Sequence, residues 1–130
     1  MKSTAEIGKI GEDVACRYLK NKGVTVVGRN YRKKWGEIDI IAKTSNIYRF
    51  IEVKSVSCEN IDGISQETDG FRPEDNVHRA KILRLSRAIQ TYIAEYRLGD
   101  IEWEFDVIAV YIDVRNKRAR VRYLPNIIVD

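Results

Sequence analysis

The sequence of 130 residues predicts an α/β fold, in which a mixed central sheet of about five strands lies between two main helices. Two long segments repeat apolar residues at helical spacing, one near the N-terminus and one in the second half of the chain. The segments between and after them are rich in β-branched and aromatic residues, as strands are. The predicted order is therefore one helix, three strands, a long loop, a second helix and two strands, arranged as a three-layer α/β/α domain.

The first helix is predicted over residues 4–22. Ser3 and Glu6 have the spacing of a capping box, and Gly23 suits the C-terminal stop. The apolar stripe of this helix is Ile7, Ile10, Gly11, Val14, Ala15, Tyr18 and Leu19. Glu12 falls beside that stripe at 100° per residue. Helix geometry alone leaves two alternatives for Glu12, a half-buried position against the sheet or a bare flank of the helix.

The next three strands are predicted over residues 24–31, 36–42 and 47–55. A basic turn with one aromatic residue, residues 32–36, joins the first strand to the second. Such runs are usually solvated turns. Here, however, the run leads directly into an acidic hairpin, so phosphate contact by Arg32, Lys33 and Lys34 is a reasonable alternative.

The acidic hairpin, residues 36–55, is the stretch with the strongest functional signal. If Ser45 and Asn46 form its turn, paired positions sum to 91, and Asp39 lies opposite Glu52. The same register places Glu37 opposite Lys54. Like charges on facing strands repel each other, and a divalent cation between the two carboxylates would explain their position.

The two faces of the hairpin differ in character. Period-two alternation places Lys54 on the face of Asp39 and Glu52, together with Tyr48 and Phe50. The opposite face is apolar and consists of Ile38, Ile40, Ile47, Ile51 and Val53. The alternative is a solvated face of mixed charges. We favour a sheet covered on both sides, where charged groups have a function or a partner.

The second half of the chain completes the sheet. A loop without periodicity, residues 56–76, precedes a helix that begins near Asp75 or Asn76 and ends before Gly99. The predicted buried stripe of this helix is Val77, Ile82, Leu85, Ile89, Tyr92, Ile93 and Tyr96, and the predicted outer faces carry Arg79, Lys81, Arg84 and Arg87. Strands follow over residues 102–113 and 118–124. Asp106 lies on an apolar strand face, where structural hydrogen bonding is the simpler role.

Composition limits the function classes. Apolar residues make up 44% and charged residues 32%, which is typical of a single globular domain over residues 1–130. The net charge of +4 favours an anionic partner without naming one. Cys16 and Cys58 form no metal or disulfide pattern and indicate a reducing compartment. With neither a signal peptide nor an apolar run of membrane length, we expect a cytoplasmic protein without a membrane partner.

Several motifs together resemble a known family. Asp39, twelve intervening residues and then Glu52-Val53-Lys54 resemble the D…(D/E)-x-K site of the restriction-endonuclease-like nucleases. The wider pattern consists of Gly11-Glu12-x-x-Ala15-x-x-Tyr18-Leu19, Arg29-Asn30-Tyr31, Gly36-Glu37-Ile38-Asp39-Ile40-Ile41-Ala42, Ile51-Glu52-Val53-Lys54 and Phe105-Asp106-Val107-Ile108. In this order the motifs resemble the YraN-like family of uncharacterised bacterial proteins, itself similar to archaeal Holliday-junction resolvases.

The resemblance implies a restriction-endonuclease-like fold and a metal-dependent endonuclease that hydrolyses phosphodiester bonds in DNA, branched or junction DNA included. It implies that Asp39, Glu52 and the backbone carbonyl of Val53 bind Mg²⁺ or Mn²⁺, and that Glu12 adds a further ligand. Lys54 would position or deprotonate the attacking water. Sparse acidic sites suit Mg²⁺, which retains several waters and needs only one or two carboxylates plus phosphate.

Two features depart from the family pattern. After the lysine the family continues with threonine or serine and then a basic residue, whereas Ser55 is followed by Val56. The loop over residues 56–76 is also longer and more acidic than we expect. The alternatives to a nuclease are therefore a non-catalytic nucleic-acid-binding module and a scaffold with a vestigial site. The sequence leaves the oligomeric state open, a homodimer included.

Overall fold

The computed structural model describes residues 2–59, 61 and 79–127, and in this part of the chain it confirms the α/β fold. The helices are α1 (Thr4–Asn21) and α2 (Arg79–Glu95). The strands are β1 (Thr25–Lys33), β2 (Gly36–Thr44), β3 (Ile47–Ser57), β4 (Glu102–Asp113) and β5 (Arg118–Leu124). They form one mixed sheet in the order β1-β2-β3-β4-β5, in which β3 and β4 are parallel and the other neighbours antiparallel.

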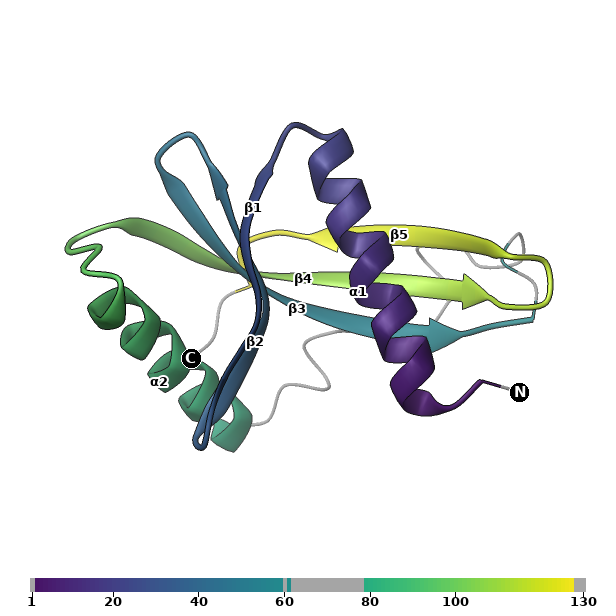
Figure 1. Ribbon diagram of the computed structural model, residues 1–130, viewed down its shortest axis with the longest axis horizontal. Coiled ribbons are helices and arrows are strands. Elements are labelled where there is room, and N and C mark those ends of the chain that lie inside the picture. Colours follow the sequence, from purple (N-terminus) through teal and green to yellow (C-terminus); the bar gives the residue numbers. More distant parts are fainter. Residues whose placement is uncertain (1, 60, 62–78, 128–130) are drawn as a thin grey trace.

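The two helices cover opposite faces of the sheet. In Figure 1, α1 crosses over β3, β4 and β5, whereas α2 lies beside the curved β1–β2 ribbon. The α1 core joins Ala15, Cys16 and Leu19 to Ile40, Ala42, Ile51, Ile108 and Val110. The α2 core joins Ala88, Ile89 and Tyr92 to Ile38, Ile41 and Phe50. Adjacent residues of β3, Phe50 and Ile51, thus point into different cores, as alternation requires.

The N-terminal helix follows its sequence signals. The Ser3 hydroxyl accepts a hydrogen bond from the Glu6 N–H, and the Glu6 carboxylate accepts one from the Ser3 N–H, both at 3.1 Å. This is the predicted capping box. After the helix, Gly23 has φ of 81°, which only glycine adopts without strain. None of the helices in the described part of the chain is long and apolar enough to cross a membrane.

The predicted hairpin register is correct over the half of the ribbon next to its turn. Thr44 pairs with Ile47 around a two-residue turn, and the ladder continues to Ile40 opposite Ile51. Ser45 has φ of 51°, as this kind of turn requires. The described β2–β3 ladder ends there, because β2 remains paired with β1 as far as Gly36 and curves away from β3 (Figure 1).

This divergence corrects two predicted pairings. Asp39 and Glu52 are not partners in the described β2–β3 ladder. Glu37 pairs with Arg32 of β1 and not with Lys54. The Arg32 Nε lies 3.3 Å from the Glu37 Oε2. The curvature also breaks the alternation of β2, because Ile38 packs in the α2 core although Ile40 packs in the α1 core. The prediction that Ile38 and Ile40 share a face was wrong.

The other boundaries differ little from prediction. β3 continues to Ser57, and most of the loop predicted over residues 56–76, like the predicted start of the second helix with Val77, lies outside the described residues. α2 ends at Glu95, and Tyr96, predicted to be buried, is 57% exposed. Tyr96 follows the last residue of the helix, and the φ of 54° at Arg97 shows that the backbone leaves the helical conformation at this point.

Asp106 has the structural role predicted for it. Its carboxylate is fully buried and accepts hydrogen bonds from the Tyr123 hydroxyl and, at 2.8 Å, from the Asn126 N–H. Arg49 lies 3.2 Å from the same carboxylate and also pairs with Glu104. These bonds satisfy a buried charge that would otherwise be costly, and they connect β3, β4 and β5.

Candidate metal centre

Asp39 lies at the fork where β2 leaves β3. Its Oδ2 accepts a hydrogen bond of 2.8 Å from the Val53 N–H, so a side chain closes the fork where the backbone ladder has ended. Desolvation raises the pKa of this half-buried carboxyl to about 6, against the effect of that hydrogen bond. The negative charges of Glu12, Glu52 and Glu37 contribute to this rise. A nearby cation would reverse this effect.

Glu52 is the second acid of the site, and its two oxygens differ. Its Oε1 contacts the Lys81 ammonium and lies 3.7 Å from the Lys54 ammonium. Its Oε2 is buried and has no hydrogen-bond partner among the described residues. A buried carboxylate oxygen without a partner costs free energy, so Glu52 carries an oxygen that the described residues leave unsatisfied.

The pKa values of the two lysines near Glu52 shift in opposite directions. Partial burial, together with the neighbouring Lys81 ammonium, lowers the pKa of Lys54. Burial is the largest single influence on Lys81 and lowers its pKa, but the hydrogen bonds to Glu52 and Lys54 and the charges of Glu52 and Asp39 together outweigh burial and raise the pKa above its ordinary value. Lys54 is therefore the better proton acceptor of the two, and Lys81 is the more firmly charged.

Glu12 approaches from the opposite face of the sheet. It lines a cavity of about 570 Å³ with Val53 and Ser55, under α1, whereas Glu52 pairs with a residue of α2. Its side chain is 19% exposed, and its Oε1 lies 3.6 Å from the Arg29 guanidinium. Among the described residues, no three His, Cys, Asp or Glu side chains are close enough to form a metal-binding group. Glu12 thus raises the pKa of Asp39, but it does not form a preformed group of three metal ligands with Asp39 and Glu52.

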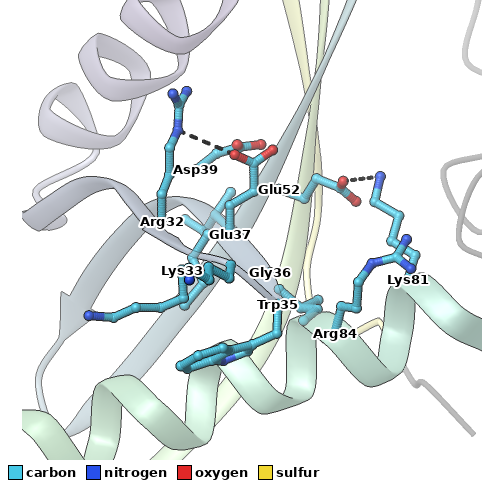
Figure 2. Close-up of a pocket in the computed structure, with 13 residues that line it drawn as sticks. Arg32, Lys33, Trp35, Gly36, Glu37, Asp39, Glu52, Lys81 and Arg84 are labelled. Atoms are coloured by element: carbon cyan, nitrogen blue, oxygen red, sulfur yellow. Dashed lines mark ion pairs between the residues drawn. The ribbon is translucent and has the colours of Figure 1, made fainter.

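Asp39 and Glu52 line a cavity of about 530 Å³ on the α2 side of the sheet. Its walls come from the β1–β2 turn, the fork and the first turns of α2 (Figure 2). Five of the lining residues are basic: Arg32, Lys33, Lys34, Lys81 and Arg84. An acidic floor between basic walls is a suitable shape for a cation and the phosphate that it would bind.

The three basic residues predicted to contact nucleic acid all line this cavity, but two of them have acidic partners. Arg32 pairs with Glu37, and Lys33 lies 3.4 Å from the Glu95 carboxylate. Figure 2 shows Lys33 directed away from Asp39 and Glu52. Lys34 is exposed. Exposed ion pairs are weak, so Arg32 remains available to phosphate.

The β1–β2 turn is held against α2 by a close contact. A Cβ added at Gly36 would lie 2.4 Å from the carbonyl oxygen of Arg84, a distance that real atoms do not reach. Next to it, the Arg87 guanidinium lies 4.7 Å from the Trp35 ring centroid, a cation–π contact. Glycine at position 36 is therefore required by the approach of two backbones that form the cavity wall.

We expect Gly36→Ala to destabilise the protein by about 1–3 kcal/mol, because the turn must move away from α2. Urea unfolding measures this change. The matched control is Gly8→Ala in α1, where an added Cβ would meet nothing within 4 Å. That substitution should stabilise the helix by roughly 0.5–1 kcal/mol. Equal effects of the two substitutions would mean that the Gly36–Arg84 contact is unimportant.

Sequence reasoning missed the contribution of α2. Lys81, Arg84 and Arg87 were placed on outer faces, but the first two line the cavity and the third packs on Trp35. The side chain of Arg79 lies outside the described residues. A signal was present for Lys81, because it precedes Leu85 by four residues and Ile89 by eight. This spacing continues the apolar stripe towards the sheet.

Comparison with known proteins gives one consistent result. The model of the uncharacterised protein family UPF0102 matches residues 11–110, which include all the acids and lysines of the site. A UPF0102 protein of Dictyoglomus turgidum is 32% identical over 121 residues, 93% of this chain and 95% of the relative. A UPF0102 protein of Syntrophotalea carbinolica is 39% identical over 119 residues, 92% of this chain and 88% of the relative.

Proposed function

The chain belongs to the uncharacterised protein family UPF0102, the YraN-like family that its sequence resembles, and we propose that it is a metal-dependent endonuclease acting on DNA. One observation supports this most strongly. Asp39 and Glu52, one of whose buried carboxylate oxygens has no hydrogen-bond partner among the described residues, line a cavity whose walls are basic. We place the reaction in the cytoplasm and include branched and junction DNA among the substrates.

The residues of the site fit Mg²⁺ or Mn²⁺. The Glu52 oxygen without a partner costs free energy, and so does the ionised form of Asp39, as its raised pKa indicates. A bound divalent cation would relieve both costs. Mg²⁺ needs only one or two carboxylates beside its waters and the substrate phosphate, so a third acid is not essential. Asp39 and Glu52 would hold the ion, and the Val53 carbonyl and Glu12 are the further candidates.

Each protein group has a task in phosphodiester hydrolysis. When bound, the ion supplies positive charge to the phosphate and lowers the pKa of water. Lys54, whose own pKa is lowered, takes up or directs a proton of the attacking water at its Nζ. Arg84 and Lys34, on the cavity walls, hold the phosphates on either side of the scissile bond.

The direct test is a panel of nucleic acids incubated with the protein with and without Mg²⁺ or Mn²⁺. The panel includes supercoiled plasmid, linear duplex, a four-way junction and RNA. We expect DNA cleavage that requires the cation and stops with a chelator. Binding without cleavage of any substrate would instead identify a nucleic-acid-binding module, and neither binding nor cleavage would favour a vestigial site.

DNA binding should weaken steeply as salt rises. Cations from the protein release counterions from phosphate, and each phosphate contact contributes about −0.9 to the slope of log affinity against log salt. Lys34→Ala should reduce the magnitude of this slope by about one. Fluorescence anisotropy at several salt concentrations measures it. Lys20→Ala, an exposed lysine at the end of α1, is the control and should leave the slope unchanged. Affinity independent of salt would exclude this mode of binding.

A further inference from the structure

We propose that Lys81 is a displaceable counter-ion of the metal site: its ammonium neutralises Glu52 until a divalent cation takes its place. The inference rests on the proposed function, since it needs a cation that binds Glu52. It adds a residue of α2 to a site whose other members lie on β2 and β3. Figure 2 shows Lys81 reaching from α2 towards Glu52.

The contacts at Glu52 place Lys81 where a cation would bind. Within the described part of the chain its ammonium is the positive group nearest to the Glu52 carboxylate, and Lys54 lies farther from the same oxygen, at 3.7 Å. The other oxygen of that carboxylate has no partner among the described residues. Both ammonium groups are therefore on the Oε1 side of Glu52, while Oε2 is buried without a partner. A carboxylate satisfied by a permanent ion pair would not leave one oxygen in this state.

Charge explains why Lys81 must leave. Asp39 and Glu52 carry two negative charges, and Lys54 and Lys81 balance them. A divalent cation bound to the acids would leave two excess positive charges within a few ångströms of both ammonium groups. Repulsion at such distances is strong even at an effective dielectric constant of about 20. Moving one ammonium into water relieves it.

Exposure identifies Lys81 as the lysine that moves. Its side chain is 35% exposed, compared with 25% for Lys54 and 15% for Glu52. It extends from the surface of a helix, so a change of rotamer takes its ammonium into solvent without moving the sheet. Lys54 projects from β3, which is paired with β4 along its whole length, and has less freedom. Lys81 therefore competes with the cation, and Lys54 remains in place.

The test compares the Mn²⁺ affinities of the metal-free protein and its variants by calorimetry, without DNA. Removing the competitor with Lys81→Met should tighten Mn²⁺ binding roughly ten-fold. Arg84→Met is the matched control, because Arg84 lines the same cavity one turn along α2 but forms no ion pair with Glu52. It should change the affinity about two-fold at most, by loss of a screened charge.

Thermal unfolding gives a second readout that does not depend on activity. Without metal, Lys81→Met should have a lower Tm than the parent, since Glu52 loses its closest partner, and saturating Mn²⁺ should raise that Tm more than it raises the parent's. Lys81→Gln should behave in the same way. Equal Mn²⁺ affinity and equal metal-induced Tm shifts in Lys81→Met and the parent would overturn the counter-ion role alone. A parent that binds no divalent cation would overturn the proposed function as well.

Discussion

Asp39→Asn is expected to reduce metal-dependent cleavage on the order of 10³-fold or more while the protein remains folded. The substitution removes one of the two charges that would hold the cation, whose effect on phosphate and water amounts to several kcal/mol. An amide can still accept the hydrogen bond from the Val53 N–H, so the fork between β2 and β3 stays closed. Initial cleavage rates on the best substrate of the panel measure this loss.

The same substitution should stabilise the metal-free protein in a pH-dependent way. The pKa of Asp39 is about 6 in the folded protein and 3.8 ordinarily, so the folded state holds the proton more tightly than the unfolded one. Stability is therefore lost as pH rises from about 4 to about 6, and at pH 8 the whole cost is present. Asparagine carries no charge and avoids this cost.

We expect Asp39→Asn to be more stable than the parent by roughly 1–3 kcal/mol at pH 8 and by clearly less at pH 4.5, in urea unfolding without metal. Glu37→Gln is the control, because Glu37 is exposed and its pair with Arg32 is weak. It should change stability by less than about 0.5 kcal/mol at both values of pH. A gain for Asp39→Asn that is equal at both, or a loss at pH 8, would show that Asp39 is a structural residue.

Lys54→Ala should also stop cleavage, but it should retain metal binding. The Lys54 ammonium is not a ligand for a cation, and its expected task is to direct the attacking water or, once deprotonated, to accept a proton from it. The loss should be roughly 10²–10⁴-fold, the usual contribution of a positioned acid or base. Cleavage rates and Mn²⁺ calorimetry on the same variant separate the two properties. Lys9→Ala, a 77% exposed lysine on α1, should leave both unchanged.

Both variants should bind DNA, because the basic walls of the cavity are unaltered. Binding separated from cutting is therefore the expected pattern for Asp39→Asn and for Lys54→Ala. If Lys54→Ala cuts as well as the parent, the proton must pass through another group. If it loses Mn²⁺ altogether, Lys54 supports the site structurally.

The sequence was sufficient for those features that depend on short-range pattern. The capping box at Ser3 and the two-residue turn at Ser45 and Asn46 are local, and both were predicted correctly. The register of the hairpin followed from that turn, but only as far as Ile40 and Ile51. Beyond them β2 follows β1 instead of β3, a choice between two partners that no local rule decides.

For the candidate site, the sequence predicted which acids lie near each other better than it predicted how they are arranged. Asp39 and Glu52 do line one cavity, but they are not cross-strand neighbours, and Glu12 lies under α1 on the other side of the sheet. Lys81 was missed because a charged residue at the beginning of a helix usually faces water. Only the packing of α2 against β2 shows that its stripe ends over Glu52.

The most direct test of the metal site is a crystal grown with Mn²⁺, in which anomalous scattering locates the ion independently of any activity. We expect an anomalous peak in contact with the carboxylates of Asp39 and Glu52, with the Lys81 ammonium displaced from Glu52. A crystal at saturating Mn²⁺ in which these carboxylates bind no ion, and Lys81 still pairs with Glu52, would contradict the proposed nuclease.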